Sequence, residues 1–163
     1  MLKPILLVED NPKDMELALI ALERSRLANE VITIHDGEEA LAYLRRTGEH
    51  AKRHEGNPAV ILLDLKMPKM NGLQVLEAVR SDAKLKSIPI VMLTSSNEEP
   101  DLKDAYRLGV NAYVVKPVKF SEFVSAMSGL GTFWAILNEP PAGSVRFLPR
   151  PAEAKVQVPP GKD

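Results

Sequence analysis

The sequence predicts an α/β fold in which helices cover both faces of a doubly wound, five-stranded parallel sheet. Five short apolar runs rich in β-formers recur along the chain, separated by segments with helical periodicity. The runs are apolar at consecutive rather than alternate positions, which is typical of strands that are buried on both faces. Five alternations of strand and helix imply right-handed crossovers and an open sheet.

The five predicted strands are 5–8, 31–34, 59–63, 90–93 and 112–115. Asn11 is expected to cap the first helix, with Pro12 at its first position and Asp14 as an acid in its first turn. Asp36 is expected to cap the second helix. The remaining helices are expected at 73–80, from about Pro100 to just before Gly109, and at 121–137.

Composition and charge exclude several classes of protein. The chain of 163 residues has no cysteine, which rules out disulfides, iron–sulfur clusters and a cysteine nucleophile. Its net charge of −1 argues against a dedicated nucleic-acid binder. The longest apolar run, 59–63, is too short to cross a bilayer. The first residues, Met1-Leu2-Lys3-Pro4, lack the apolar region that is expected of a signal peptide. We therefore expect a cytoplasmic protein with neither nucleic acid nor membrane as a partner.

The chain divides into one domain and an extension. Residues 1–138 carry the alternating pattern, whereas 139–163 hold six of the 13 prolines and show little periodicity. We expect this extension to be extended or disordered, and too short for an output domain. A polar loop is expected at 48–58, and its Lys52-Arg53 pair is interpreted as solvated surface.

Polar side chains follow four of the predicted strands directly. They are Glu9 and Asp10 after the first, Asp64 after the third, Thr94 after the fourth and Lys116 after the fifth. Each alone could be a helix cap or a solvated turn. Because ligands bind beyond the carboxyl ends of parallel strands, together they predict a site.

The chemistry of this set points to Mg²⁺ and a phosphoryl group. Three clustered carboxylates resist ionisation unless a cation lies between them, and Mg²⁺ accepts oxygen ligands while keeping several waters. Lys116 can neutralise a phosphoryl group and the Thr94 hydroxyl can donate to it. Asp64 can serve as the nucleophile that becomes an aspartyl phosphate.

Two other classes of protein fit less well. An aspartate-nucleophile phosphohydrolase would need a second acid two residues after Asp64, where the chain has Lys66. A flavin- or nucleotide-binding domain would need a phosphate-binding loop after the first strand, where Glu9 and Asp10 would repel phosphate. Neither of these classes is therefore expected.

The chain resembles the receiver domains of two-component response regulators. The matching pieces are Val8-Glu9-Asp10, 63–68 with Asn71-Gly72 behind it, Thr94-Ser95, and 113–117. This resemblance implies a signalling switch rather than an enzyme, the flavodoxin-like strand order 2-1-3-4-5, and a sensor histidine kinase as phosphodonor. It implies Asp64 as phosphoacceptor and Mg²⁺ held by Glu9, Asp10, Asp64 and the Lys66 carbonyl. It also implies Thr94 and Lys116 as phosphate sensors, Tyr113 as the switch aromatic, and a cis Lys116–Pro117 bond.

A narrower resemblance concerns regulators that partner phytochrome-type histidine kinases. It rests on the long 48–58 loop and on Phe133-Trp134 near the end of the last predicted helix. Adjacent residues point about 100° apart on a helix, so one of this pair is drawn toward the edge of the apolar stripe. We expect a homodimer through the fifth helix and fifth strand, anchored by Trp134, and output through an unknown downstream protein.

Overall fold

The computed structural model describes residues 2–24, 28–54, 56–95, 97–116, 121–122, 125–126 and 129. Five parallel strands form one sheet in the order β2-β1-β3-β4-β5, which confirms the expected fold class and strand order. The strands are β1 (Ile5–Val8), β2 (Val31–Ile34), β3 (Val60–Leu63), β4 (Ile90–Thr94) and β5 (Ala112–Val115).

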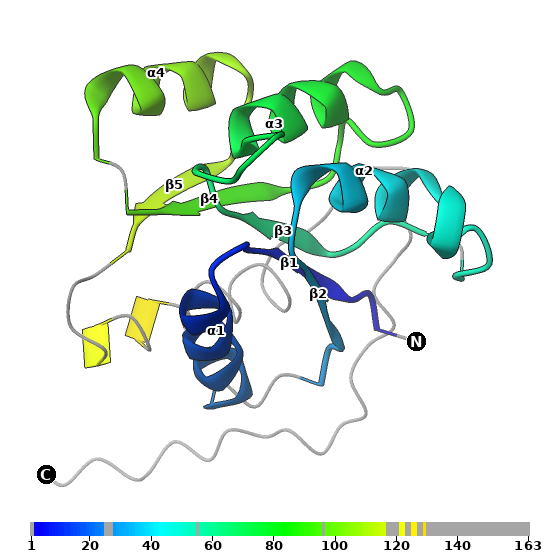
Figure 1. Cartoon of the computed structure of the whole chain (residues 1–163), viewed down its shortest axis with the longest axis horizontal. Coiled ribbons are helices and arrows are strands. Elements are labelled where there is room, and N and C mark those ends of the chain that lie inside the picture. The colour runs from blue at the N-terminus through cyan, green and yellow to red at the C-terminus, as the bar shows by residue number, and fades with distance from the viewer. Residues whose placement is uncertain are drawn as a thin grey trace, which may run out of the picture.

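The helices divide between the two faces of this sheet. They are α1 (Pro12–Arg24), α2 (Gly37–Arg45), α3 (Gly72–Ser81) and α4 (Glu99–Arg107), with a short 3₁₀ helix, η1 (Gly48–His50), after α2. Figure 1 shows α2, α3 and α4 over one face and α1 over the other. None of the helices in these described ranges is long and apolar enough to cross a bilayer.

Several predictions concern parts of the chain outside the described residues. The expected fifth helix is described only at 121–122, 125–126 and 129. Trp134, Pro117 and the extension 139–163 fall outside. The expectations of an interface at Trp134, of a cis Lys116–Pro117 bond and of an extended tail therefore stay predictions.

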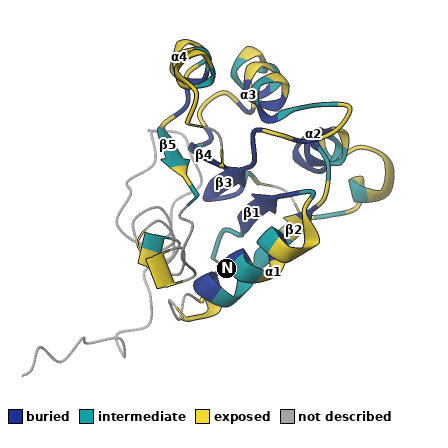
Figure 2. Cartoon of the chain, turned by 60° about the vertical axis from the view of Figure 1, so that its left-hand side comes forward, coloured by how far each residue is buried: buried dark blue, intermediate teal, exposed yellow. Residues whose placement is uncertain are grey.

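The core consists of two apolar layers, one on each face of the sheet. Every residue of β1, β3 and β4 is buried, as the dark blue strands of Figure 2 show. Alternate residues face opposite layers, so Leu6 and Ile61 pack with α2 and α3, whereas Leu7 and Leu62 pack with α1. This double burial is the reason why the strands are apolar at consecutive positions.

Side chains that cap the N-termini of α1 and α2 fix where these helices begin. The caps therefore also fix where the loops between the strands and these helices end. The Asn11 carboxamide accepts hydrogen bonds from the amides of Lys13 at 2.9 Å and Asp14 at 3.2 Å. The Asp36 carboxylate accepts from the amide of Glu39 at 2.8 Å. Both caps confirm the sequence prediction, and the first places Asp14 in the turn of α1 nearest the end of β1.

The loop after α2 corrects one interpretation of the sequence. Arg53 is not solvated surface: its guanidinium donates to the carbonyls of Tyr43 at 2.6 Å, Leu44 at 3.2 Å and Gly56 at 3.0 Å. It also lies 4.2 Å from the centre of the Tyr43 ring. The physical reason is that the last carbonyls of α2 have no intrahelical donors, and Arg53 supplies them.

Candidate functional site

Three residues of the predicted site are held by the hydrogen-bond ladder of the sheet itself. The amide of Glu9 donates to the Ile34 carbonyl at 3.0 Å. The amide of Asp64 donates to the Val8 carbonyl at 3.0 Å, and that of Lys116 to the Thr94 carbonyl at 2.7 Å. Each residue directly follows its strand, so these bonds prolong the parallel ladder by one step and bring the side chains to one rim.

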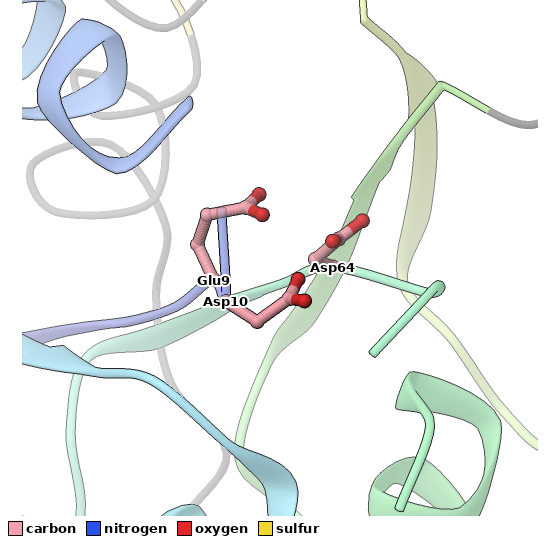
Figure 3. Close-up of side chains that lie close together, drawn as sticks. All are labelled: Glu9, Asp10 and Asp64. Carbon is pink, nitrogen blue, oxygen red and sulfur yellow. The ribbon is translucent and has the colours of Figure 1, made fainter. Parts of the chain in front are cut away.

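Glu9, Asp10 and Asp64 come together at this rim. Each offers a carboxylate oxygen, and these oxygens lie within 4.8 Å of one another (Figure 3). Glu9 and Asp64 are buried, with 3% and 6% of their surface exposed, and Asp10 is partly exposed. Three carboxylates this close repel one another, and a hard divalent cation with oxygen ligands would relieve the repulsion. The donor set therefore fits a metal such as Mg²⁺.

The environment of Asp64 opposes its ionisation. Burial is the main cause, and the neighbouring charges of Glu9 and Asp10 add to it; together they raise the pKa of Asp64 to about 7, although Lys116 opposes the shift. Because this pKa is close to neutral pH, a cation bound beside Asp64 would shift the carboxyl group back to its charged form.

Lys116 lies beside the acidic cluster and bonds to two acids. Its ammonium donates to Glu9 Oε2 at 2.7 Å and to Asp14 Oδ2 at 2.8 Å, while Asp64 Oδ1 is 3.8 Å away. Burial alone would lower the pKa of Lys116, but the hydrogen bonds that it donates to Asp14 and Glu9, together with the negative charges of Asp64 and Glu9, outweigh burial, and the pKa lies above its usual value. Lys116 therefore brings a positive charge to the rim.

Asp14 was not predicted as a site residue. Its position in the first turn of α1 is explained equally well by the helix dipole, so only the folded arrangement reveals the contact with Lys116, 102 residues later. The available signal was a carboxylate in the first turn of the helix that follows the first strand, close in sequence to Glu9 and Asp10.

The remaining predicted residues lie on β4, on β5 and in the loop after β3. Thr94 ends β4 and is completely buried. Tyr113 on β5 is partly buried and packs against the core layer under α2 and α3. Lys66 is exposed, and its ammonium pairs with Asp101 Oδ2 of α4 at 3.3 Å. The roles expected for Thr94 and Tyr113, and the Lys66 carbonyl as a metal ligand, stay predictions.

Residues 5–128 match the family model of the response regulator receiver domain, and the chain belongs to that family. Among curated proteins it is 38% identical over 132 residues to response regulator Rcp1 of Synechocystis sp. (strain ATCC 27184 / PCC 6803 / Kazusa), covering 81% of this chain and 88% of Rcp1. The two-component response regulators are thus the class that the fold and the sequence define.

Solved structures place the chain near regulators associated with phytochromes. The bacteriophytochrome response regulator RtBRR is 67% identical, with a TM-score of 0.71 and coverage of 88% of this chain and 87% of RtBRR. The phosphorylated cyanobacterial phytochrome response regulator RcpA is 42% identical, with a TM-score of 0.81 and coverage of 87% and 100%. The Mn²⁺-bound form of Rcp1 is 37% identical, with a TM-score of 0.79 and coverage of 86% and 99%.

Proposed function

We propose that this protein is a phosphorylation-dependent switch that accepts a phosphoryl group from a sensor histidine kinase onto Asp64, with Mg²⁺. The observation that carries the proposal is the gathering of Glu9, Asp10 and Asp64 at one rim, with the Lys116 ammonium beside them. A metal-bound relative and a phosphorylated relative support the choice of chemistry.

The transfer itself needs one nucleophile and much charge neutralisation. A carboxylate oxygen of Asp64 attacks the phosphorus of a phosphohistidine, the P–N bond breaks, and its electron pair stays on the imidazole, which takes up a proton. Mg²⁺ held by Glu9, Asp10 and Asp64 would neutralise charge on the phosphoryl oxygens. Lys116 donates to one of these oxygens and the Thr94 hydroxyl to another. The protein contributes positioning and electrostatics rather than acid–base catalysis, so it is a switch and not an enzyme.

The output would begin with the side chains nearest the new phosphoryl group. That group adds roughly −1.5 to −2 charges at the rim. Thr94 moves toward it, and the space that Thr94 leaves lets Tyr113 turn inward. This biases an existing equilibrium of the face formed by α4 and β5.

The partners follow from the relatives. We propose a phytochrome-type histidine kinase as phosphodonor, because RtBRR is a bacteriophytochrome response regulator and RcpA is a phytochrome response regulator. We propose an unidentified protein as downstream target, reached by direct contact. This is supported by the response regulators Rcp1 and RcpA, because the chain covers 88% and 100% of their lengths. The net charge of −1 favours neither nucleic acid nor an anionic membrane as partner, and we place the protein in the cytoplasm.

Labelling by a small phosphodonor such as acetyl phosphate tests this function. With Mg²⁺ the protein should gain one acid-labile phosphoryl group, and Asp64→Asn or chelation of the metal should abolish the gain. The matched control is Glu77→Gln on the exposed side of α3, which should be labelled like the wild type. Full labelling of Asp64→Asn would overturn the proposal.

A further inference from the structure

Asp14 and Lys116 form a contact that the proposed chemistry does not yet use. The Lys116 ammonium has three protons; Glu9 Oε2 takes one at 2.7 Å and Asp14 Oδ2 takes a second at 2.8 Å. Asp64 Oδ1, at 3.8 Å, lies beyond hydrogen-bond distance. Among the described residues, two hydrogen bonds therefore hold the ammonium, and its third proton can serve a group that arrives at Asp64.

The two acids that hold Lys116 differ in what else they do. Glu9 belongs to the acidic cluster whose oxygens lie within 4.8 Å of one another, and Asp14 does not. A divalent cation held by that cluster would compete with Lys116 for the negative charge of Glu9. Within the described part of the chain, the Asp14 carboxylate accepts its hydrogen bond from Lys116 and lies outside the acidic cluster, so it would hold more of the ammonium's position when a cation occupies that cluster.

The position of Asp14 makes it a stable tether. It lies in the first turn of α1, which Asn11 caps with two hydrogen bonds. The helix end is thus satisfied by Asn11, and the Asp14 Oδ2 atom is available to Lys116. The side chain of Lys116 is 10% exposed and that of Asp14 is 35% exposed, so the pair is sheltered on the side of the ammonium.

We propose that Asp14 is a positioning residue that holds the Lys116 ammonium beside Asp64, ready to donate to the incoming phosphoryl group. The proposal rests on the proposed phosphoacceptor function. Without Asp14, the long lysine side chain loses one of its two anchors, and in the metal-loaded protein it loses the stronger one. The ammonium then spends less time within reach of the phosphoryl oxygens, and transfer slows.

A double-mutant cycle on phosphorylation rate tests this role. With saturating Mg²⁺ and acetyl phosphate, Asp14→Asn should slow labelling roughly five-fold, as expected for one partly solvated charge-assisted hydrogen bond. In a Lys116→Met background the same change should alter the rate less than two-fold, because the residue through which Asp14 acts is gone. Asp14→Glu should recover at least half of the wild-type rate.

The controls separate this role from charge, folding and failure of the proposed function. Glu16→Gln removes the same charge from an exposed position of α1 and should leave the rate unchanged. Thermal unfolding checks that each variant is folded. An unchanged rate in Asp14→Asn, or an equal loss in both backgrounds, would overturn the positioning role while Asp64-dependent labelling persists. Labelling that does not depend on Asp64 would instead overturn the function and this role with it.

Discussion

Gly72 lies so close to Asp64 that a side-chain carbon on Gly72 would overlap the Asp64 carbonyl oxygen. The same carbon would lie 2.9 Å from the Cα atom of Leu65. The amide of Gly72 donates to the Leu65 carbonyl at 2.9 Å, and Asn71 and Gln74 form a capping box around it. The start of α3 is thus packed directly on the backbone that carries the phosphoacceptor.

Gly72→Ala should therefore damage both stability and phosphorylation. The methyl group can be accommodated only if α3 or the backbone at Asp64 moves, which should cost about 1–3 kcal/mol in the free energy of unfolding. Urea unfolding and labelling with acetyl phosphate measure the two effects. Gly129→Ala is the matched control, because no atom of the described residues would lie within 4 Å of a side-chain carbon there. A Gly72→Ala protein with wild-type stability would contradict the close packing.

The pKa of Asp64 predicts an unusual dependence of stability on pH. Folding raises this pKa from 3.8 to about 7, so between these values the folded protein binds more protons than the unfolded chain. The free energy of unfolding should therefore fall as pH rises through this window. Asp64→Asn removes the titrating carboxyl group and therefore does not lose stability in this window. With a chelator present, its free energy of unfolding at pH 8 should exceed that of the wild type by on the order of 2 kcal/mol.

Urea unfolding at pH 4 and pH 8 measures this difference. The two proteins should be nearly equal at pH 4, close to the ordinary pKa of 3.8, because the Asp64 carboxyl is then protonated in the folded protein and about half protonated in the unfolded chain. Adding Mg²⁺ at pH 8 should stabilise the wild type and narrow the gap. The exposed Glu77→Gln variant should follow the wild type at both pH values. An advantage of Asp64→Asn that is the same at pH 4 and pH 8 would rule out titration of Asp64 as its cause.

The ion pair between Lys66 and Asp101 predicts an effect on phosphoryl lifetime rather than on stability. Its atoms are 3.3 Å apart, but 61% of the Lys66 side chain is exposed, so Asp101→Asn should change stability by less than about 1 kcal/mol. The released ammonium is two residues from Asp64 and can contact the phosphoryl group or hinder the attacking water. The lifetime of the phosphorylated protein should lengthen; a pulse of labelled donor followed by dilution measures it, and a shorter lifetime would contradict the idea.

The predicted homodimer can be related to the exposed surface of the α4 and β5 region. Leu102 and Tyr106 are one turn apart on α4 and are 37% and 53% exposed, and Val115 at the end of β5 is 42% exposed. Light scattering of the wild type, before and after phosphorylation, should give the mass of a dimer, and Trp134→Ala should weaken it. A wild type that stays monomeric in both states would contradict the prediction; an intact Trp134→Ala dimer would remove only this anchor.

The fold could be predicted because β1, β3 and β4 are buried on both faces, which produces runs of consecutive apolar residues. The edge strands β2 and β5 are only partly buried, although their sequences show the same apolar runs. The bounds shifted by one residue at two strands: β3 begins at Val60, and β4 continues to Thr94 because Thr94 pairs with Val115. The end of a strand depends on which residues of the neighbouring strand it pairs with. These partners cannot be read from the local sequence.

The site could be predicted in part for a related reason. The rule that ligands bind beyond the ends of parallel strands identified Glu9, Asp10 and Asp64 without knowledge of the packing. Asp14 and Arg53 escaped it because their partners are set by tertiary structure. Asp14 meets an ammonium from another strand end, and Arg53 meets the carbonyls of a helix that ends before it.

Glu9, Asp64 and Lys116 are held through their backbone amides, each bonded to the end of a neighbouring strand. These bonds are the same for any side chain other than proline, so the frame of the site does not depend on the groups that it displays. The chain can therefore exchange its chemistry residue by residue while the sheet keeps its shape. Such an arrangement allows related proteins to differ in phosphodonor, in metal and in phosphoryl lifetime while they keep the same fold.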